Sequence, residues 1–229
     1  MLFGGIQKTT LVDYPGKVAT TLFTIGCPLR CRFCYNPELV IPEQYATPIP
    51  EDEILAFLAK RVGYVQAVCV TGGEPTVQRD LRTFLAKIKA LGYLVKLDTN
   101  GVNPHLVEPI LADGTVDYVA MDLKGPLAVY HTIVGGVSIT QQVQKSIDLL
   151  MHAGIDYEFR TTVSKPLLAV PDFHAMGQLI KGAVRYFMQN YVAAGKQVGQ
   201  EVALEPFTPD ELLQAKAIMQ TYVPHVEIR

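Results

Sequence analysis

The stretch Ala67-Val-Cys-Val-Thr-Gly-Gly-Glu-Pro75 decides the fold class, because it is a short apolar, β-rich run that ends in a turn. A helix is predicted over Asp80–Leu91, with Gly92 as the residue that follows its end, and a second β-rich run covers Leu94–Asp98. Two strands joined through a helix are typical of parallel pairing, since parallel neighbours need a crossover connection. This unit predicts an α/β fold.

The same alternation of strand and helix runs along most of the chain. Strands are predicted at Val18–Ile25, Ala67–Thr71, Leu94–Asp98, Tyr118–Leu123, Tyr157–Val163 and Val202–Glu205. Helices are predicted at Glu51–Arg61, Asp80–Leu91, Pro104–Ala112, Thr140–Ala153, Pro171–Gln189 and Pro209–Tyr222. The segments Glu38–Pro50 and Ala193–Gln200 are predicted to be loops.

Six strand–helix units fit either an open doubly wound sheet or an incomplete (β/α)6-type TIM barrel with parallel strands. Polar residues follow most of the predicted strands, at Gly72–Pro75, Asp98–Gly101, Asp122–Lys124, Arg160–Thr162 and Glu205–Phe207. In a barrel the carboxyl ends of all strands converge on one mouth, whereas a doubly wound sheet gathers only those near its switch point. The placement of the polar residues therefore favours the partial barrel.

The composition indicates a folded protein without a strong charge bias. The chain has 229 residues, of which 49% are hydrophobic and 18% charged, and its formal net charge is -2. This excludes an intrinsically disordered chain and gives no overall electrostatic argument for binding nucleic acid or a membrane. No apolar run is long enough to cross a bilayer. We therefore expect one domain over residues 1–229 and a cytoplasmic location.

Three of the four cysteines lie within eight residues. Cys27, Cys31 and Cys34 have the spacing C-x3-C-x2-C directly after the first predicted strand. Three thiolates can bind one face of a cubane iron–sulfur cluster and leave the fourth iron without a protein ligand. A structural zinc site is the alternative, with Cys69 as a fourth ligand, but Cys69 lies in an apolar strand where a small buried side chain is expected.

The cysteine loop, with Phe33 just before the third cysteine, resembles that of the radical S-adenosylmethionine (radical SAM) enzymes. Within that superfamily the chain resembles activating enzymes of glycyl-radical proteins, most of all the activating protein of anaerobic ribonucleoside-triphosphate reductase. The resemblance runs from Gly4 to about Arg160. The stretches that carry it are Leu11–Lys17, Cys34–Val40, Thr71–Pro75, Asp98–Gly101 and Met121–Lys124.

The resemblance implies two cofactors and a reaction. It implies a [4Fe–4S] cluster held by Cys27, Cys31 and Cys34, whose open iron is chelated by the amino and carboxylate groups of S-adenosylmethionine. Reductive cleavage of this cofactor gives a 5′-deoxyadenosyl radical, which removes a hydrogen atom from a glycine of the partner. A flavodoxin- or ferredoxin-type protein is the implied electron donor, and a monovalent cation is a further implied cofactor.

The resemblance also implies which side chains bind the cofactors. Glu74 can accept hydrogen bonds from the ammonium group, and Gly72 and Gly73 let a ligand approach the backbone. The remaining candidates are Phe33, Tyr35, Pro75, Asp98, Thr99, Asp122, Lys124 and Arg160. A tight turn at Gly72–Pro75 is the structural alternative for the glycines.

Ion pairs are the alternative for the charged candidates: Asp98 or Asp122 with Lys124, and Arg160 with Glu158. At three positions the sequence does not decide between contact with the cofactor and contact with the partner. They are Tyr35, where many members have histidine, Glu205, where activating enzymes often have glutamine, and the loop residue His131.

Two other functions remain open from the sequence. A radical SAM enzyme with a small-molecule substrate, similar to the short 7-carboxy-7-deazaguanine synthases, would use the same cofactor motifs. An iron–sulfur electron carrier or zinc-binding module would use the cysteines, but it has no need of Gly72–Pro75. A glycyl-radical enzyme, of the anaerobic ribonucleotide reductase type, is therefore the partner that we expect.

Overall fold

The computed structural model describes residues 1–193, 196–199 and 201–229. The chain forms two compact units. The first unit contains residues 1–28, 36–99 and 103–120, and the second contains residues 29–35, 100–102 and 121–229. The single domain that we expect from the sequence stays a prediction. No helix in the described part of the chain is long and apolar enough to cross a membrane.

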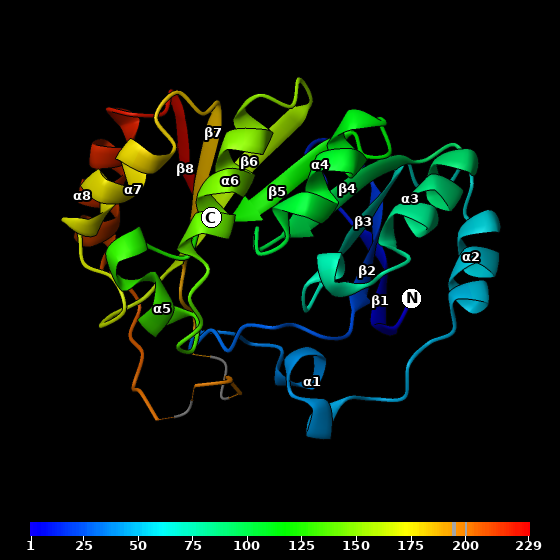
Figure 1. Cartoon of the computed structure of the whole chain (residues 1–229), viewed down its shortest axis with the longest axis horizontal. Helices are drawn as coiled ribbons and strands as arrows, with labels where there is room; N and C mark the ends of the chain where they lie inside the picture. Colours follow the sequence, from blue (N-terminus) through cyan, green and yellow to red (C-terminus); the bar gives the residue numbers. More distant parts are fainter. Residues whose placement is uncertain (194–195, 200) are drawn as a thin grey trace. The chain divides into compact units, whose positions relative to one another are not determined.

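The first unit is built on four strands that follow one another in the sheet (Figure 1). β1 pairs with β2 antiparallel, whereas β2 with β3 and β3 with β4 are parallel. The strands are β1 (Phe3–Thr10), β2 (Ala19–Thr24), β3 (Ala67–Gly72) and β4 (Leu94–Thr99). The helices are α1 (Pro37–Val40), η1 (Pro42–Gln44), α2 (Glu51–Ala59), η2 (Pro75–Val77), α3 (Leu81–Ala90) and α4 (Pro104–Ala112).

Apolar periodicity explains how α3 joins β3 to β4. Leu81, Phe84, Leu85 and Ile88 are buried at helical spacing. Gly92 has φ +89°, a conformation that favours glycine, and it ends the helix as predicted.

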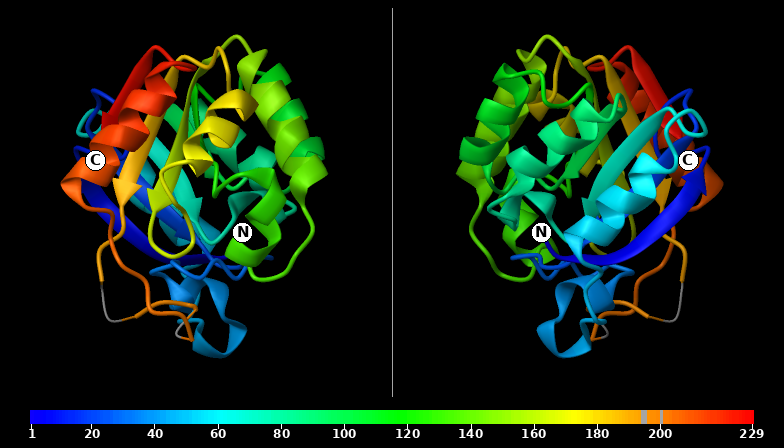
Figure 2. Two further views of the ribbon diagram at one scale, coloured as in Figure 1. Left: turned by 90° about the vertical axis from the view of Figure 1, so that its left-hand side faces the viewer. Right: turned by 90° about the vertical axis from the view of Figure 1, so that its right-hand side faces the viewer.

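α1 lies beyond the carboxyl end of β2 (Figure 2), where the Gly26 amide donates to the Leu39 carbonyl at 2.8 Å.

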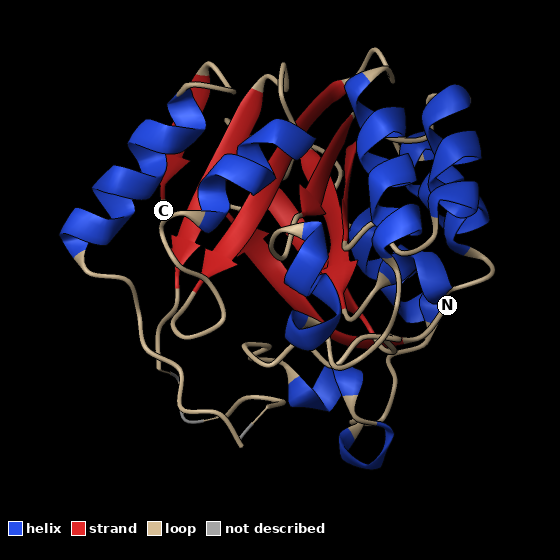
Figure 3. Ribbon diagram, turned by 60° about the vertical axis from the view of Figure 1, so that its left-hand side comes forward, coloured by secondary structure: helices blue, strands red, loops and turns tan. Residues whose placement is uncertain are grey.

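The second unit contains the end of β5 (Tyr118–Asp122) and three parallel strands. These strands are β6 (Asp156–Val163), β7 (Arg185–Asn190) and β8 (His225–Ile228). The helices are η3 (Leu127–Val129), α5 (Tyr130–Ile133), α6 (Thr140–Met151), α7 (Asp172–Leu179) and α8 (Pro209–Gln220). α7 and α8 lie side by side next to these strands (Figure 3). A capping box between Thr208 and Glu211 starts α8.

Parallel strand pairs joined through helices dominate both units, which confirms the predicted α/β fold. The pattern is consistent with a fold of the partial TIM-barrel type. Two elements at the ends of the chain, β1 and β8, were not expected from the sequence. β1 contains two glycines and polar residues, and β8 is only four residues long, so neither has a clear strand pattern.

The segment Glu38–Pro50, predicted to be a loop, contains most of α1 and all of η1. One predicted helix and one predicted strand are also wrong. The helix predicted over Pro171–Gln189 ends at Leu179, because Gly182 turns the chain with φ +90° and the following residues form β7. The strand predicted at Val202–Glu205 does not form, and only Glu205 makes an isolated antiparallel bridge, with Lys165. The predicted loop at Ala193–Gln200 includes residues 194, 195 and 200, which lie outside the described residues.

Candidate active site

In the first unit, the Gly72–Pro75 turn packs against the chain that leads into the cysteine loop. The Gly73 amide donates to the Thr24 carbonyl at 2.8 Å, and the Glu74 amide donates to the Gly26 carbonyl at 2.8 Å. A Cβ atom on Gly73 would lie 2.2 Å from the Gly26 oxygen, and Gly72 has φ +119°. The two glycines are therefore required by the close approach of the chain's own backbone. Cys27, the first cysteine of the motif, is half-buried and follows Gly26 directly.

The Glu74 carboxylate is fully buried and held in a fixed orientation. Its Oε1 atom accepts hydrogen bonds from the Thr76 amide at 3.1 Å, the Thr76 hydroxyl at 2.5 Å and the Thr99 hydroxyl at 2.8 Å. Pro75 is buried at the start of η2, which Glu74 caps. The turn thus fixes an acidic side chain, which the alternative of a simple tight turn does not require. Thr99 reaches this carboxylate from the end of β4.

Asp98, the other candidate at the end of β4, forms an ion pair with Lys96 rather than with Lys124. Both side chains are on the same face of β4, because they are two residues apart in a strand. The Lys96 ammonium is 3.8 Å from the Cys69 thiol, and Cys69 is fully buried, as expected for its place in β3. Lys96 is not among the site residues predicted from the sequence. The signal was a lysine in the middle of an otherwise apolar strand.

In the second unit, the cysteine loop is fixed by the backbone of α5 and the residues after it. The Arg30 amide donates to the Val134 carbonyl at 3.0 Å, and the Arg32 amide donates to the Ile133 carbonyl at 3.2 Å. A Cβ atom on Gly135 would lie 2.6 Å from the Arg30 Cβ atom, so this contact needs a glycine. One side of the loop is therefore held in place by main-chain contacts.

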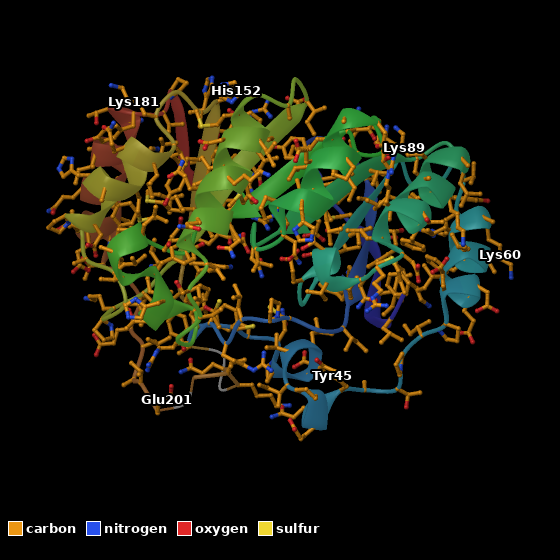
Figure 4. All side chains as sticks on the ribbon, viewed as in Figure 1. Tyr45, Lys60, Lys89, His152, Lys181 and Glu201 are labelled. Atoms are coloured by element: carbon orange, nitrogen blue, oxygen red, sulfur yellow. The ribbon has the colours of Figure 1, made fainter. Side chains whose placement is uncertain are left out.

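A segment that follows β7 holds the cysteine loop as well. The Val198 amide donates to the Cys34 carbonyl at 3.0 Å, and the Gly199 amide donates to the Arg32 carbonyl at 3.2 Å. A Cβ atom on Gly199 would lie 2.7 Å from the Arg32 Cα atom. Arg32 also forms an ion pair with Glu201 at 3.3 Å, and Glu201 is labelled in Figure 4. The sequence predicts only a loop here, because main-chain pairing of irregular segments leaves no residue pattern.

Tyr35 is bound to the same segment. Its ring stacks on Tyr191 with the centroids 5.6 Å apart, and its hydroxyl accepts a hydrogen bond from the Val192 amide at 2.7 Å. This geometry gives Tyr35 a structural task that a histidine could not perform in the same way, since the imidazole ring is smaller and lacks a hydroxyl. A role of Tyr35 next to the cofactor stays a prediction.

Cys31 and Cys34 form a tight turn in which the Cys34 amide donates to the Cys31 carbonyl at 3.0 Å. Burial raises the pKa of the Cys31 thiol to about 11, although the Lys124 ammonium acts in the opposite direction. Among residues 1–193, 196–199 and 201–229, no three His, Cys, Asp or Glu side chains form a group that could already hold a metal ion. The donor chemistry nevertheless fits an iron–sulfur cluster, since the loop supplies thiols and a cluster binds thiolates.

Asp122, Lys124 and Arg160 form a charged group at the ends of β5 and β6. Asp122 accepts from the Lys124 ammonium at 2.9 Å and from Arg160 Nε at 3.0 Å, so Arg160 pairs with Asp122. Glu158 pairs with Arg229. Burial alone would raise the pKa of Asp122, but the two cations hold it well below its usual range.

The ammonium of Lys124 joins this charged group to the cysteine loop. It lies 5.3 Å from the centroid of the Phe33 ring, and the backbone amide of Lys124 donates to the buried Tyr130 hydroxyl at 3.2 Å. Burial alone would lower the pKa of Lys124, but the Asp122 carboxylate outweighs this effect and raises it. Lys124 is therefore charged and fixed next to an aromatic residue of the motif.

His131 and Glu205 of the second unit are both exposed. His131 lies on α5, and Glu205 is in the isolated bridge with Lys165. Neither residue takes part in the hydrogen bonds, ion pairs or ring contacts described above for the candidate cofactor-binding residues. Their contact with cofactor or partner stays a prediction.

Comparison with known proteins shows the family of the chain. The radical SAM superfamily matches residues 21–166, and the chain belongs to this superfamily. Membership implies a [4Fe–4S] cluster and S-adenosylmethionine as cofactors.

Two relatives from Methanocaldococcus jannaschii are similar over nearly the whole chain, and both are named "Putative glycyl-radical enzyme activating enzyme". One is 28% identical over all of this chain and 95% of its own length, and the other is 26% identical over 98% of this chain and 85% of its own length. A "Probable GTP 3′,8-cyclase" of Pyrococcus horikoshii is 28% identical, but over 60% of this chain and 44% of its own length.

Solved structures show the same fold. The structure of Streptococcus suis SuiB bound to the precursor peptide SuiA matches with a TM-score of 0.71 at 15% identity, over 90% of this chain. This chain spans 47% of that protein. Coproporphyrinogen III oxidase (HemN) from Escherichia coli, a radical SAM enzyme, matches with a TM-score of 0.60 at 13% identity, over 92% of this chain and 53% of its own.

Proposed function

We propose that this radical SAM enzyme is an activating enzyme that generates a glycyl radical on a partner protein. The extent of the match to its relatives carries this proposal. The two relatives named as activating enzymes align with the whole chain and with 95% and 85% of their own lengths. The cyclase relative aligns with 60% of the chain and 44% of its own length, which is the extent expected for a shared cofactor-binding core. The activating enzymes therefore share with this chain also the part that lies outside that core.

The bound cofactors would supply one-electron cleavage of a carbon–sulfur bond and hence a 5′-deoxyadenosyl radical for hydrogen abstraction. Cys27, Cys31 and Cys34 would hold the cluster. In the first unit, Glu74 would bind the ammonium group of S-adenosylmethionine. Its carboxylate is suited to this because three hydrogen bonds on Oε1 fix its orientation before any ligand arrives, so little ordering is needed on binding.

The charged group of the second unit is proposed to bind the anionic part of the same cofactor. Lys124 and Arg160 carry two positive charges and Asp122 one negative charge, so the group has a net positive charge. Asp122 orients both cations. The carboxylate of S-adenosylmethionine would bind the same two cations next to Asp122. Phe33 and Tyr35 would border the cofactor, and Asp98 and Thr99 would do so from the end of β4.

The proposed partner is an anaerobic ribonucleotide reductase, and the proposed electron donor is a flavodoxin or ferredoxin. The resemblance in Cys34–Val40, Asp98–Gly101 and Met121–Lys124 supports this assignment. The match to full-length relatives named as activating enzymes supports the broader class of glycyl-radical partners.

Electron paramagnetic resonance of the partner tests the proposal. The cluster-loaded enzyme, reduced without oxygen, is mixed with S-adenosylmethionine and a candidate glycyl-radical enzyme. We expect a glycyl-radical doublet on the partner and an equal amount of 5′-deoxyadenosine. Cys31→Ala is the matched control and should give neither product. Deoxyadenosine without a radical on any glycyl-radical enzyme encoded in the same organism would contradict the activase function and favour a small-molecule substrate.

A further inference from the structure

Lys96 is a buried lysine in the interior of a strand. Its side chain is 1% exposed, and the surrounding strand β4 contributes Val95 and Leu97 to the core. A buried ammonium group is costly unless it is paired, so such a residue calls for an explanation. Its partner is the Asp98 carboxylate on the same face of β4.

The groups around this ion pair come from neighbouring strands of the first unit. Cys69 pairs with Lys96 in the register of β3 and β4, and its sulfur lies 3.8 Å from the ammonium and 3.7 Å from Asp98 Oδ1. The Tyr118 ring faces the ammonium with its centroid 5.9 Å away, a cation–π contact. These contacts favour a positive charge at this position.

We propose that the Lys96 ammonium provides the positive charge at Asp98 in place of the monovalent cation that the resemblance implies as a further cofactor, so that this protein binds S-adenosylmethionine without an alkali ion. The inference rests on the proposed role of Asp98 in the cofactor site. It departs from the resemblance, since Asp98 Oδ1 is already bound to an ammonium group of the chain itself.

Charge and entropy both favour the Lys96 ammonium over a free cation at Asp98. A carboxylate with an ammonium at hydrogen-bond distance attracts a second cation only weakly, because the two positive charges repel each other. An ammonium on the side chain is present at every ionic composition, whereas a free ion must be bound from solution. Asp98 is directly followed by Thr99, whose hydroxyl donates to the Glu74 carboxylate at 2.8 Å, so both candidate residues lie at the end of β4.

The binding of S-adenosylmethionine to the cluster-loaded wild-type enzyme tests this inference. The Kd is measured by anaerobic calorimetry in potassium, sodium and choline chloride at one ionic strength. We expect it to differ by less than about threefold between the three salts, since a fixed ionic strength keeps general screening constant. A larger loss of affinity in choline chloride would overturn the inference.

Lys96→Met tests it from the opposite side. Without the ammonium, the affinity should fall by about tenfold or more in choline chloride and recover in potassium or sodium chloride, because the buried Asp98 carboxylate has lost the ammonium that balances its charge. Lys60→Met is the matched control: Lys60 is an exposed lysine of the same unit, at the end of α2 (Figure 4), and its removal should change nothing. A folded Lys96→Met enzyme without any response to the alkali ion would overturn the inference.

A second readout does not use the cofactors. In the cluster-free Lys96→Met protein, the melting temperature should rise on exchange of choline for potassium or sodium, whereas that of Lys96→Met/Asp98→Asn should not. If Lys96→Met fails to fold, the wild-type titration decides alone. Both readouts are independent of the glycyl radical, so failure of the proposed function leaves them interpretable.

Discussion

Two acid–lysine pairs lie at the carboxyl ends of β4 and β5, and each is close to a cysteine. In the first unit the pair is Lys96 with Asp98, near the Cys69 thiol. In the second unit it is Asp122 with Lys124, whose charges influence the pKa of Cys31. In both, the two residues are separated by one position, and within β4 this spacing places the Lys96 and Asp98 side chains on the same face of the strand.

The order of acid and base distinguishes the two pairs. Lys96 precedes its acid and lies inside the strand, so it is buried together with a structural cysteine. Lys124 follows its acid and lies beyond the strand end, where it reaches the Phe33 ring of the cysteine loop. In this protein, the pair in which the lysine comes first is buried inside a strand. The pair in which the acid comes first extends beyond the strand end to the cysteine loop.

The largest expected difference between the two regions is in iron binding. Cys31→Ala should abolish the cluster, because two thiolates hold a cubane poorly. Cys69→Ala should leave the iron content unchanged, since Cys69 is a buried residue of β3. Iron and sulfide analysis after anaerobic reconstitution measures both. A full iron complement in Cys31→Ala, or loss of iron in Cys69→Ala, would contradict the contrast and favour a closed four-cysteine site.

The two lysines should differ in their contribution to stability. Lys96→Met removes the ammonium from a carboxylate whose side chain is 11% exposed and should cost about 3–5 kcal/mol. Lys124→Met leaves Asp122 paired with Arg160 and 31% exposed, so about 1–2 kcal/mol is expected. Urea unfolding of the cluster-free variants measures the free energy of unfolding. Equal losses would show that burial does not separate the two pairs.

Gly199, which contacts the cysteine loop at Arg32, should tolerate a side chain poorly. Gly199→Ala places a Cβ atom 2.7 Å from Arg32, and the overpacking should cost about 1–3 kcal/mol and slow cluster loading. Gly5→Ala is the matched control, since its Cβ atom would meet its nearest neighbour, on Phe23, at 3.8 Å. The rate of reconstitution, followed by visible absorption, should fall only in Gly199→Ala. Equal rates would remove the segment after β7 from the description of the site.

The smallest effect is expected at Tyr35. Tyr35→Phe keeps the ring for the contact with Tyr191 but removes the acceptor of the Val192 amide, at a cost of about 0.5–1.5 kcal/mol. The melting temperature of the cluster-free protein should fall slightly. Tyr35→His should lower it further, because the histidine ring also loses the stacking area. A histidine variant as stable as the wild type would show that the stacked pair does not hold the loop.

Local patterns predicted much of the fold. α3 with Gly92 and the parallel pair β3–β4 follow from apolar periodicity and turn residues, which act over a few neighbouring positions. β7 was mistaken for the end of a helix, because Arg185–Asn190 carries apolar residues that suit either state and the break at Gly182 was not recognised. β1 forms because it pairs with β2. Its own glycines and polar residues give it little local preference for a strand.

The sequence by itself determined the family and the chemical type of the site, because the spacing of Cys27, Cys31 and Cys34 and the Gly72–Pro75 motif are short-range features. Only the tertiary structure decided which charges pair. It assigned Asp98 to Lys96 and Arg160 to Asp122, and it placed Val198 and Gly199 on the cysteine loop. Such pairings depend on burial and on contacts between residues distant in the chain, for which the linear order of residues carries no local signal.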